Sequence, residues 1–148
     1  MLLDGASPAT VAAAAKHCDV LCFRLNRTSP ADFKLPDGID KPVIIAEFGF
    51  SALDRGMLAG DLPDQAARAA AYKEYMIGAL KNPQIVGCHW SQFRDYPASG
   101  RARDEANYNA GFVDIADTPY DEMIQAAREV GKTMYKARLE AKQAMAKQ

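Results

Sequence analysis

One glutamate stands directly after a run of residues that has the character of a buried strand. Residues 42–46 are apolar or small and rich in β-branched side chains, and Glu47 follows them, two residues before Gly49. Such a run predicts a strand covered on both faces, as in a parallel sheet. Packing alone gives little reason for a carboxylate there, whereas α/β enzymes place their chemistry at the carboxyl ends of parallel strands. Glu47 is therefore the candidate centre of a site, against the alternatives of a solvated edge residue or half of a structural ion pair.

Two other apolar runs also carry residues that packing leaves unexplained. Arg24 interrupts the run 19–25 and Asn26 follows it, while the run 84–90 closes on Trp90. A charged residue inside a strand needs a partner or access to water. A lone tryptophan at a strand end has packing as its ordinary explanation. These positions are candidates for function with a structural alternative beside each of them.

Alternation along a strand predicts which side chains share a face. Glu47 is expected on the same face as Ile45 and Val43, and Arg24 on the same face as Asn26. Helical and extended segments alternate along the chain, which predicts parallel strands covered by helices. Two of the connections that follow strands are long, which is typical of functional loops.

The expected elements have recognisable start and stop signals. Ser7 and Pro8 are typical of the first turn of a helix, Asp64 is a fair N-cap, and Asn82-Pro83 ends the helix that Asp64 begins. The pattern predicts helices over 8–17, 64–81 and 121 to about 136 with a polar helical continuation, strands over 19–25, 42–46 and 84–90, and a short extended piece over 111–115. The buried side of the middle helix is expected to consist of small and aromatic residues: Ala67, Ala70, Ala71, Tyr75, Ala79 and Leu80.

Composition narrows the class of function. The chain has 148 residues, of which 49% are hydrophobic, enough for the core of one domain. A net charge of −1 gives no general attraction to nucleic acid or to acidic membranes, and no apolar run is long enough to span a bilayer. Cys18, Cys22 and Cys88 fit neither a disulfide framework nor a zinc site, and Cys22 and Cys88 are expected to be small buried hydrophobes. Two histidines are too few for a metal site.

Several segments resemble one family of enzymes. Residues 41–48 with the string Leu-Asp-Arg-Gly-Met at 53–57, the segment 82–95 that contains His-Trp-Ser-Gln, and residues 107–120 are similar to the β-agarases of glycoside hydrolase family 50. The similarity runs from about residue 19 to residue 135, and the Leu-Asp-Arg-Gly-Met string is its most specific part. It implies an α/β fold, namely the C-terminal part of a (β/α)₈ TIM barrel, about strands six to eight with their helices.

The resemblance also implies roles for particular residues. Glu47 would be the nucleophile of a retaining glycosidase, and Trp90 would stack on the sugar in the cleaved subsite. Arg24 or Asn26 would orient Glu47 and keep it ionised. The remaining polar candidates for binding sugar hydroxyls are His89, Gln92, Asp95 and Asn107. The expected partner is an agarose or other galactan oligosaccharide, without cofactor or metal, and the family implies an extracellular or periplasmic location, although no signal peptide is visible.

Two departures from the family limit the expected activity. A whole barrel needs roughly 250 residues, so residues 1–148 are expected to form a single partial domain with a helical tail over 137–148. The acid/base Glu of the family follows an Asn, and no Asn-Glu pair occurs in this sequence. We therefore expect a segment that is inactive alone and self-associates through its open barrel edge. The alternatives are a truncated product that contacts carbohydrate without cleaving it, and a β-galactosidase of the same clan.

Overall fold

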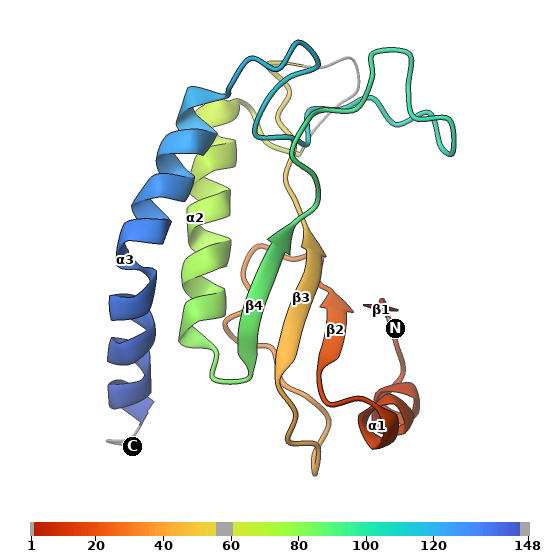
Figure 1. Ribbon diagram of the computed structural model, residues 1–148, viewed down its shortest axis with the longest axis vertical. Coiled ribbons are helices and arrows are strands. Elements are labelled where there is room, and N and C mark those ends of the chain that lie inside the picture. Colours follow the sequence, from red (N-terminus) through yellow and green to blue (C-terminus); the bar gives the residue numbers. More distant parts are fainter. Residues whose placement is uncertain (1, 56–60, 146–148) are drawn as a thin grey trace. The chain divides into compact units, whose positions relative to one another are not determined.

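The computed structural model describes residues 2–55 and 61–145, and the side chains of these ranges up to residue 144. The chain order is strand, helix, two strands, helix, strand, helix (Figure 1). The elements are β1 (Leu2–Leu3), α1 (Pro8–His17), β2 (Leu21–Arg24), β3 (Val43–Phe48), α2 (Gln65–Lys81), β4 (Ile85–Trp90) and α3 (Asp121–Met145). The predicted alternation of helices and strands is confirmed. The short strand β1 was not predicted, and β2 is shorter than the apolar run 19–25.

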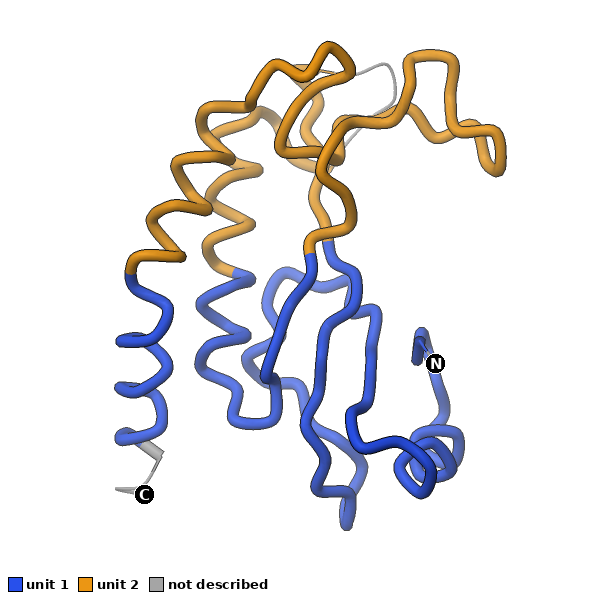
Figure 2. Tube along the Cα trace, viewed as in Figure 1, with its two compact units in different colours: residues 1–48, 75–89, 133–148 blue, residues 49–74, 90–132 orange. Residues whose placement is uncertain are grey.

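The chain forms two compact units, each assembled from separate stretches of sequence (Figure 2). Unit 1 consists of residues 1–48, 75–89 and 133–148, and unit 2 of residues 49–74 and 90–132. Helices α2 and α3 are each divided between the two units.

Unit 1 contains the sheet, whose strands stand in the order β1-β2-β3-β4. Strand β1 pairs with β2, and β2 with β3, in parallel. The sheet therefore has the parallel arrangement that the sequence predicts. One face of β2 and β3 is buried, with Leu21, Phe23, Val43 and Ile45 all at 7% exposure or less.

An irregularity in β3 overturns the face predicted for Glu47. Phe23 pairs with Ile45 but the next residue, Arg24, pairs with Glu47, so Ala46 is an extra residue at this step. Because Arg24 follows Phe23 directly, it points to the opposite face from the buried Phe23–Ile45 pair, and Glu47 shares that face. The expectation that Glu47 faces the same way as Ile45 and Val43 is wrong, because a bulge changes the parity of a strand.

The predicted helix signals match the observed helix ends, while one predicted helix face is partly wrong. Ser7 caps α1 by accepting a hydrogen bond from the Thr10 N–H at 3.2 Å, and Asp64 accepts one from the Ala67 N–H at 2.8 Å before α2. On α2, Tyr75 and Ala79 are buried as expected, but several predicted core positions are not fully buried: Ala67, Ala70, Ala71 and Leu80. Other α2 residues are buried in addition to Tyr75 and Ala79: Gln65, Arg68, Ala69 and Tyr72.

Unit 2 contains the loops that follow β3 and β4, and these loops surround a small core. Val113 forms isolated bridges to Arg94 and to Pro119, so the predicted extended piece over 111–115 is a pair of bridges and not a strand. Met123, Ala126 and Val130 bury one side of the first half of α3. Helix α3 continues to Met145, well past residue 136, in line with the helical continuation that the sequence predicts.

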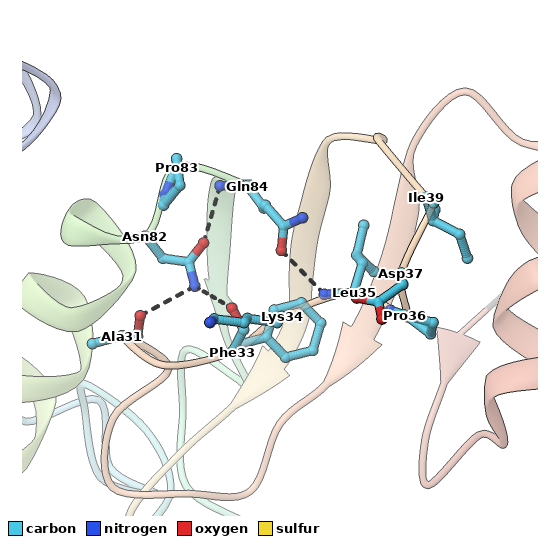
Figure 3. A pocket seen from close by; sticks show the side chains of 11 residues that line it. Ala31, Phe33, Lys34, Leu35, Pro36, Asp37, Ile39, Asn82, Pro83 and Gln84 are labelled. Atoms are coloured by element: carbon cyan, nitrogen blue, oxygen red, sulfur yellow. Dashed lines mark hydrogen bonds between the residues drawn. The ribbon is translucent and has the colours of Figure 1, made fainter. Parts of the chain in front are cut away.

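The loop between β2 and β3 is fastened by one amide side chain in unit 1. Asn82, only 2% exposed, donates from Nδ2 to the carbonyl oxygens of Pro30 and Phe33 at 3.1 and 2.7 Å. Its Oδ1 accepts the Gln84 N–H at 3.0 Å. Figure 3 shows this amide at the margin of a cavity of about 390 Å³ beside the start of β4. In α/β barrels this end of the strands is the stability face and not the catalytic one.

Candidate functional site

The carboxylate of Glu47 is held by the guanidinium of Arg24 in unit 1. Arg24 Nη2 donates to Glu47 Oε1 at 2.5 Å, and Asp4 Oδ2 lies 3.6 Å from Arg24 Nη1. All three residues stand at or just beyond the carboxyl ends of neighbouring strands. The Arg24 and Glu47 side chains are 35% and 34% exposed, so the pair is open to water. The hydrogen bond to Glu47 raises the pKa of Arg24, which keeps the guanidinium charged.

The residue after Glu47 anchors this strand end to α2. Phe48 is 2% exposed and stacks on Tyr75 with ring centroids 4.1 Å apart and ring planes 4° from parallel. The Tyr75 hydroxyl donates to the carbonyl oxygen of Leu25 at 3.0 Å, directly after Arg24. Burial raises the pKa of Tyr75, so this hydroxyl stays a donor. Tyr75 thus connects the strand ends that carry both members of the Arg24–Glu47 pair.

Trp90 lies in unit 2, within a cluster of aromatic rings. Its ring centroid is 5.5 Å from those of Tyr72 and Phe112 and 6.2 Å from that of Phe50. Its indole N–H donates to the Ala110 carbonyl oxygen at 2.7 Å. The indole is therefore fixed in direction and half-buried, an arrangement compatible both with packing and with an aromatic platform.

Asp95 organises the long loop after β4. Its Oδ1 accepts the N–H groups of Ala110 and Gly111 at 2.8 and 2.7 Å, and its Oδ2 accepts the Tyr120 hydroxyl at 2.5 Å. Burial and this carboxylate raise the pKa of Tyr120. Asp95 and Trp90 bind the same peptide group from two sides, since Asp95 accepts the Gly111 N–H and Trp90 donates to the Ala110 carbonyl oxygen. Sequence reasoning proposed Asp95 as a sugar contact, whereas within the described residues it fastens the loop.

The other predicted site residues have few protein partners. Asn26 and His89 are exposed. Gln92 donates from Nε2 to the Arg94 carbonyl oxygen at 2.6 Å. Asn107 donates to the Ala98 carbonyl oxygen at 3.3 Å, and its Oδ1 is buried without a hydrogen bond inside the described part of the chain. The roles assigned to these four residues stay predictions.

Sequence reasoning missed two fully buried polar residues in unit 2. Arg68 and Asn109 are both 0% exposed. Asn109 accepts the Ala52 N–H at 2.9 Å and donates to the carbonyl oxygens of Ala52 and Arg55. Arg68 donates to the carbonyl oxygens of the two strand-following loops. No local pattern reveals either residue, because a single polar residue on a helix or in a loop is ordinarily solvated.

Among the described residues, the cysteines and histidines form no metal-binding cluster with the acids. Within residues 2–55 and 61–145, no group of three or more His, Cys, Asp or Glu side chains could hold a metal ion. Cys22 and Cys88 are partly exposed, and not fully buried as expected. Burial raises the pKa of the Cys88 thiol to about 12. Over the same residues, no helix has both the length and the apolar character to cross a membrane.

Comparison with known proteins finds β-agarases that resemble this chain in sequence and in structure. No family model matches the chain. The chain is 39% identical over 140 residues to β-agarase B of Vibrio sp. strain JT0107, and 42% identical over 144 residues to β-agarase A of that strain. A solved exo-β-agarase is 43% identical and superposes with a TM-score of 0.81 over 88% of this chain. Sequence identities of this size indicate common ancestry and not merely a common fold.

The chain is similar in sequence and in structure to part of these β-agarases.

This β-agarase-like chain spans about one seventh of its curated relatives, 15% of β-agarase B and 14% of β-agarase A, and 18% of the solved exo-β-agarase. The sequence identities confirm the resemblance to β-agarases that the sequence predicts. The fold is α/β with a parallel sheet that matches part of the agarase structures. The assignment of its strands to positions six to eight of a barrel stays a prediction, as does the single-domain boundary over residues 1–148.

Proposed function

We propose that this chain carries the nucleophile and part of the sugar-binding wall of a retaining β-agarase-like glycoside hydrolase. The substrate would be the β-galactosidic bond of an agarose-type polysaccharide. The observation that carries the proposal is the Glu47 carboxylate, which stands at the carboxyl end of β3, open to water and bonded to Arg24. The sequence identity of 39% and 42% to two β-agarases supports the same proposal.

The pair suits nucleophilic catalysis. A nucleophilic carboxylate attacks as the anion, and the rigid plane of an arginine's donors fixes the direction of the carboxylate that it binds. In the proposed first step, Glu47 attacks the anomeric carbon as the bond to the leaving oxygen breaks, and an acid protonates that oxygen. Water then hydrolyses the glycosyl-enzyme, giving a proton back to the same acid/base group and releasing Glu47.

This chain alone lacks an identified second carboxyl group for the proposed reaction. Retaining glycosidases need two carboxyl groups about 5–5.5 Å apart. The Asn-Glu pair that would supply the acid/base group is absent from the sequence. We place that group in a part of the barrel outside these 148 residues. The same absence favours a second candidate function, in which the chain contacts carbohydrate without cleaving it.

A chimera separates these two functions. The chain replaces the matching 18% of the solved exo-β-agarase, and hydrolysis of an agarose oligosaccharide is measured for Glu47→Gln and for Glu74→Gln, an exposed residue of α2. We expect Glu47→Gln to abolish turnover and Glu74→Gln to leave it unchanged. A fluorinated galactosyl donor should form an ester on Glu47, visible by peptide mass spectrometry. Turnover that survives in Glu47→Gln, or a label on another residue, would refute the nucleophile assignment.

Arg24 has its own test in the chimera. Arg24→Lys keeps the positive charge but loses the planar fork that orients the carboxylate. We expect kcat to fall while KM stays close to that of the parent, because the substitution disturbs the attacking group and not the bound sugar. Equal kcat values in the two proteins would remove Arg24 from the proposed machinery.

A further inference from the structure

Arg68 is a buried cation that is satisfied by neutral oxygens. Its Nε donates to the Phe50 carbonyl oxygen at 2.8 Å, its Nη2 to that of Gly111 at 2.7 Å, and its Nη1 to Gln65 Oε1 at 3.0 Å. Burial lowers the pKa of Arg68, and the negative charge of Asp95 opposes that effect. Arginine is rarely buried to 0% exposure without partners, so these bonds mark a specific structural task.

The three accepting oxygens belong to three different segments of unit 2. Phe50 lies in the loop after β3, Gly111 in the loop after β4, and Gln65 in the first turn of α2. Phe50 and Gly111 are 18 and 43 residues away from Arg68 in the sequence. A guanidinium presents its donors in one rigid plane. The side chain of Arg68 therefore connects the two loops of this unit to each other and to the start of α2.

The same guanidinium also contacts the only tryptophan. Arg68 Cζ lies 5.5 Å from the centroid of the Trp90 ring, within the range of a cation–π interaction. The Trp90 indole N–H donates to the Ala110 carbonyl oxygen, and the next carbonyl along the chain, that of Gly111, accepts from Arg68. The indole is thus fixed both through its ring and through the peptide segment that it binds.

We propose that Arg68 is the positioning residue of a sugar subsite at Trp90. This inference rests on the proposed function, in which Trp90 stacks on a galactose ring. Arg68 does not touch the sugar; it holds the indole and the two loops in the arrangement that the sugar meets. Lysine cannot replace it, because an ammonium group offers its donors from one point and cannot span the oxygens of Phe50, Gln65 and Gly111.

A first experiment tests the positioning without any sugar. Trp90 is the only tryptophan of the chain, so its fluorescence reports this site alone. We compare Arg68→Lys with Arg128→Lys, an exposed position of α3 in the same unit. We expect Arg68→Lys to shift the emission to longer wavelength and to lose protection against iodide quenching, while its far-UV circular dichroism keeps the helical signal. Emission and quenching equal to those of Arg128→Lys would overturn the inference.

A second experiment tests the subsite. An agarose-derived tetrasaccharide is titrated into the full chain and into both variants while Trp90 emission is recorded. We expect binding to Arg68→Lys to be about tenfold weaker, equivalent to about 1.4 kcal/mol, and binding to Arg128→Lys to be unchanged. Absence of any response in the parent chain would count against the proposed function itself. A response that Arg68→Lys leaves unchanged would overturn the role of Arg68 alone.

A measurement on the parent chain covers the case in which Arg68→Lys fails to fold. With ¹⁵N-labelled arginine, the Nε–H of Arg68 should exchange slowly with solvent, because it is buried and bonded to Phe50, whereas that of Arg128 should exchange fast. Addition of the tetrasaccharide should shift the Arg68 resonance through the Trp90 ring and leave that of Arg128 in place. Fast exchange at Arg68, or a sugar response at Trp90 without one at Arg68, would refute the proposal.

Discussion

Replacement of Asn82 by alanine should cost unit 1 a large part of its stability. The amide of Asn82 has two N–H donors, which serve the carbonyl oxygens of Pro30 and Phe33 with Ala31 as a longer third partner, and its Oδ1 accepts the Gln84 N–H. Three effective hydrogen bonds at about 1 kcal/mol each give a loss of about 3 kcal/mol in the free energy of unfolding. That is a substantial fraction of the 5–15 kcal/mol typical of a domain.

Gln84 provides a graded control, because its side chain binds the same loop between β2 and β3. The Gln84 side chain accepts one hydrogen bond, from the Leu35 N–H at 3.1 Å, so Gln84→Ala should cost about 1 kcal/mol. The assay is equilibrium unfolding in urea, followed by far-UV circular dichroism for the parent and both variants. The bond count predicts a loss for Asn82→Ala about three times that for Gln84→Ala. A loss for Asn82→Ala no greater than that for Gln84→Ala would show that the loop is held by other contacts.

Three further predictions follow from the geometry. Phe48→Ala should lower the free energy of unfolding by about 3–5 kcal/mol, and Phe48→Leu by clearly less, because the ring is buried against Tyr75; equal urea midpoints would contradict this. The Arg101 guanidinium holds the pKa of Asp104 at about 2, below the usual 3.8. A lowered pKa means that this contact contributes stability above about pH 4 and loses it as the pH falls towards 2, so Arg101→Gln should raise the NMR titration midpoint of Asp104. The sheet edge at β1 should promote association between copies, and sedimentation velocity that finds only monomer over a concentration series would exclude it.

Local sequence predicts the position of Glu47 at the end of a strand, but it does not predict the face of the sheet to which the side chain points. The apolar run before Glu47 predicts a buried parallel strand with a carboxylate at its end, and β3 has that form. The direction of the carboxylate depends on which residue of β2 lies opposite. Pairing of Arg24 with Glu47 leaves Ala46 as the extra residue, and a pattern within one strand carries no information about its partner's register.

The sequence by itself determined the order of the elements from α1 onward, several of their boundaries and the resemblance to β-agarases. Those signals are short-range: a capping serine, a proline after the last helical turn and the period of apolar residues all act between near neighbours. Tertiary structure alone decided that Arg68 is buried, because its accepting carbonyls lie 18 and 43 residues away. It also decided that Asp95 fastens a loop, since the N–H groups that it binds are 15 and 16 residues distant. A polar side chain has the same local sequence whether water or a distant peptide satisfies it, and only the folded chain makes that choice.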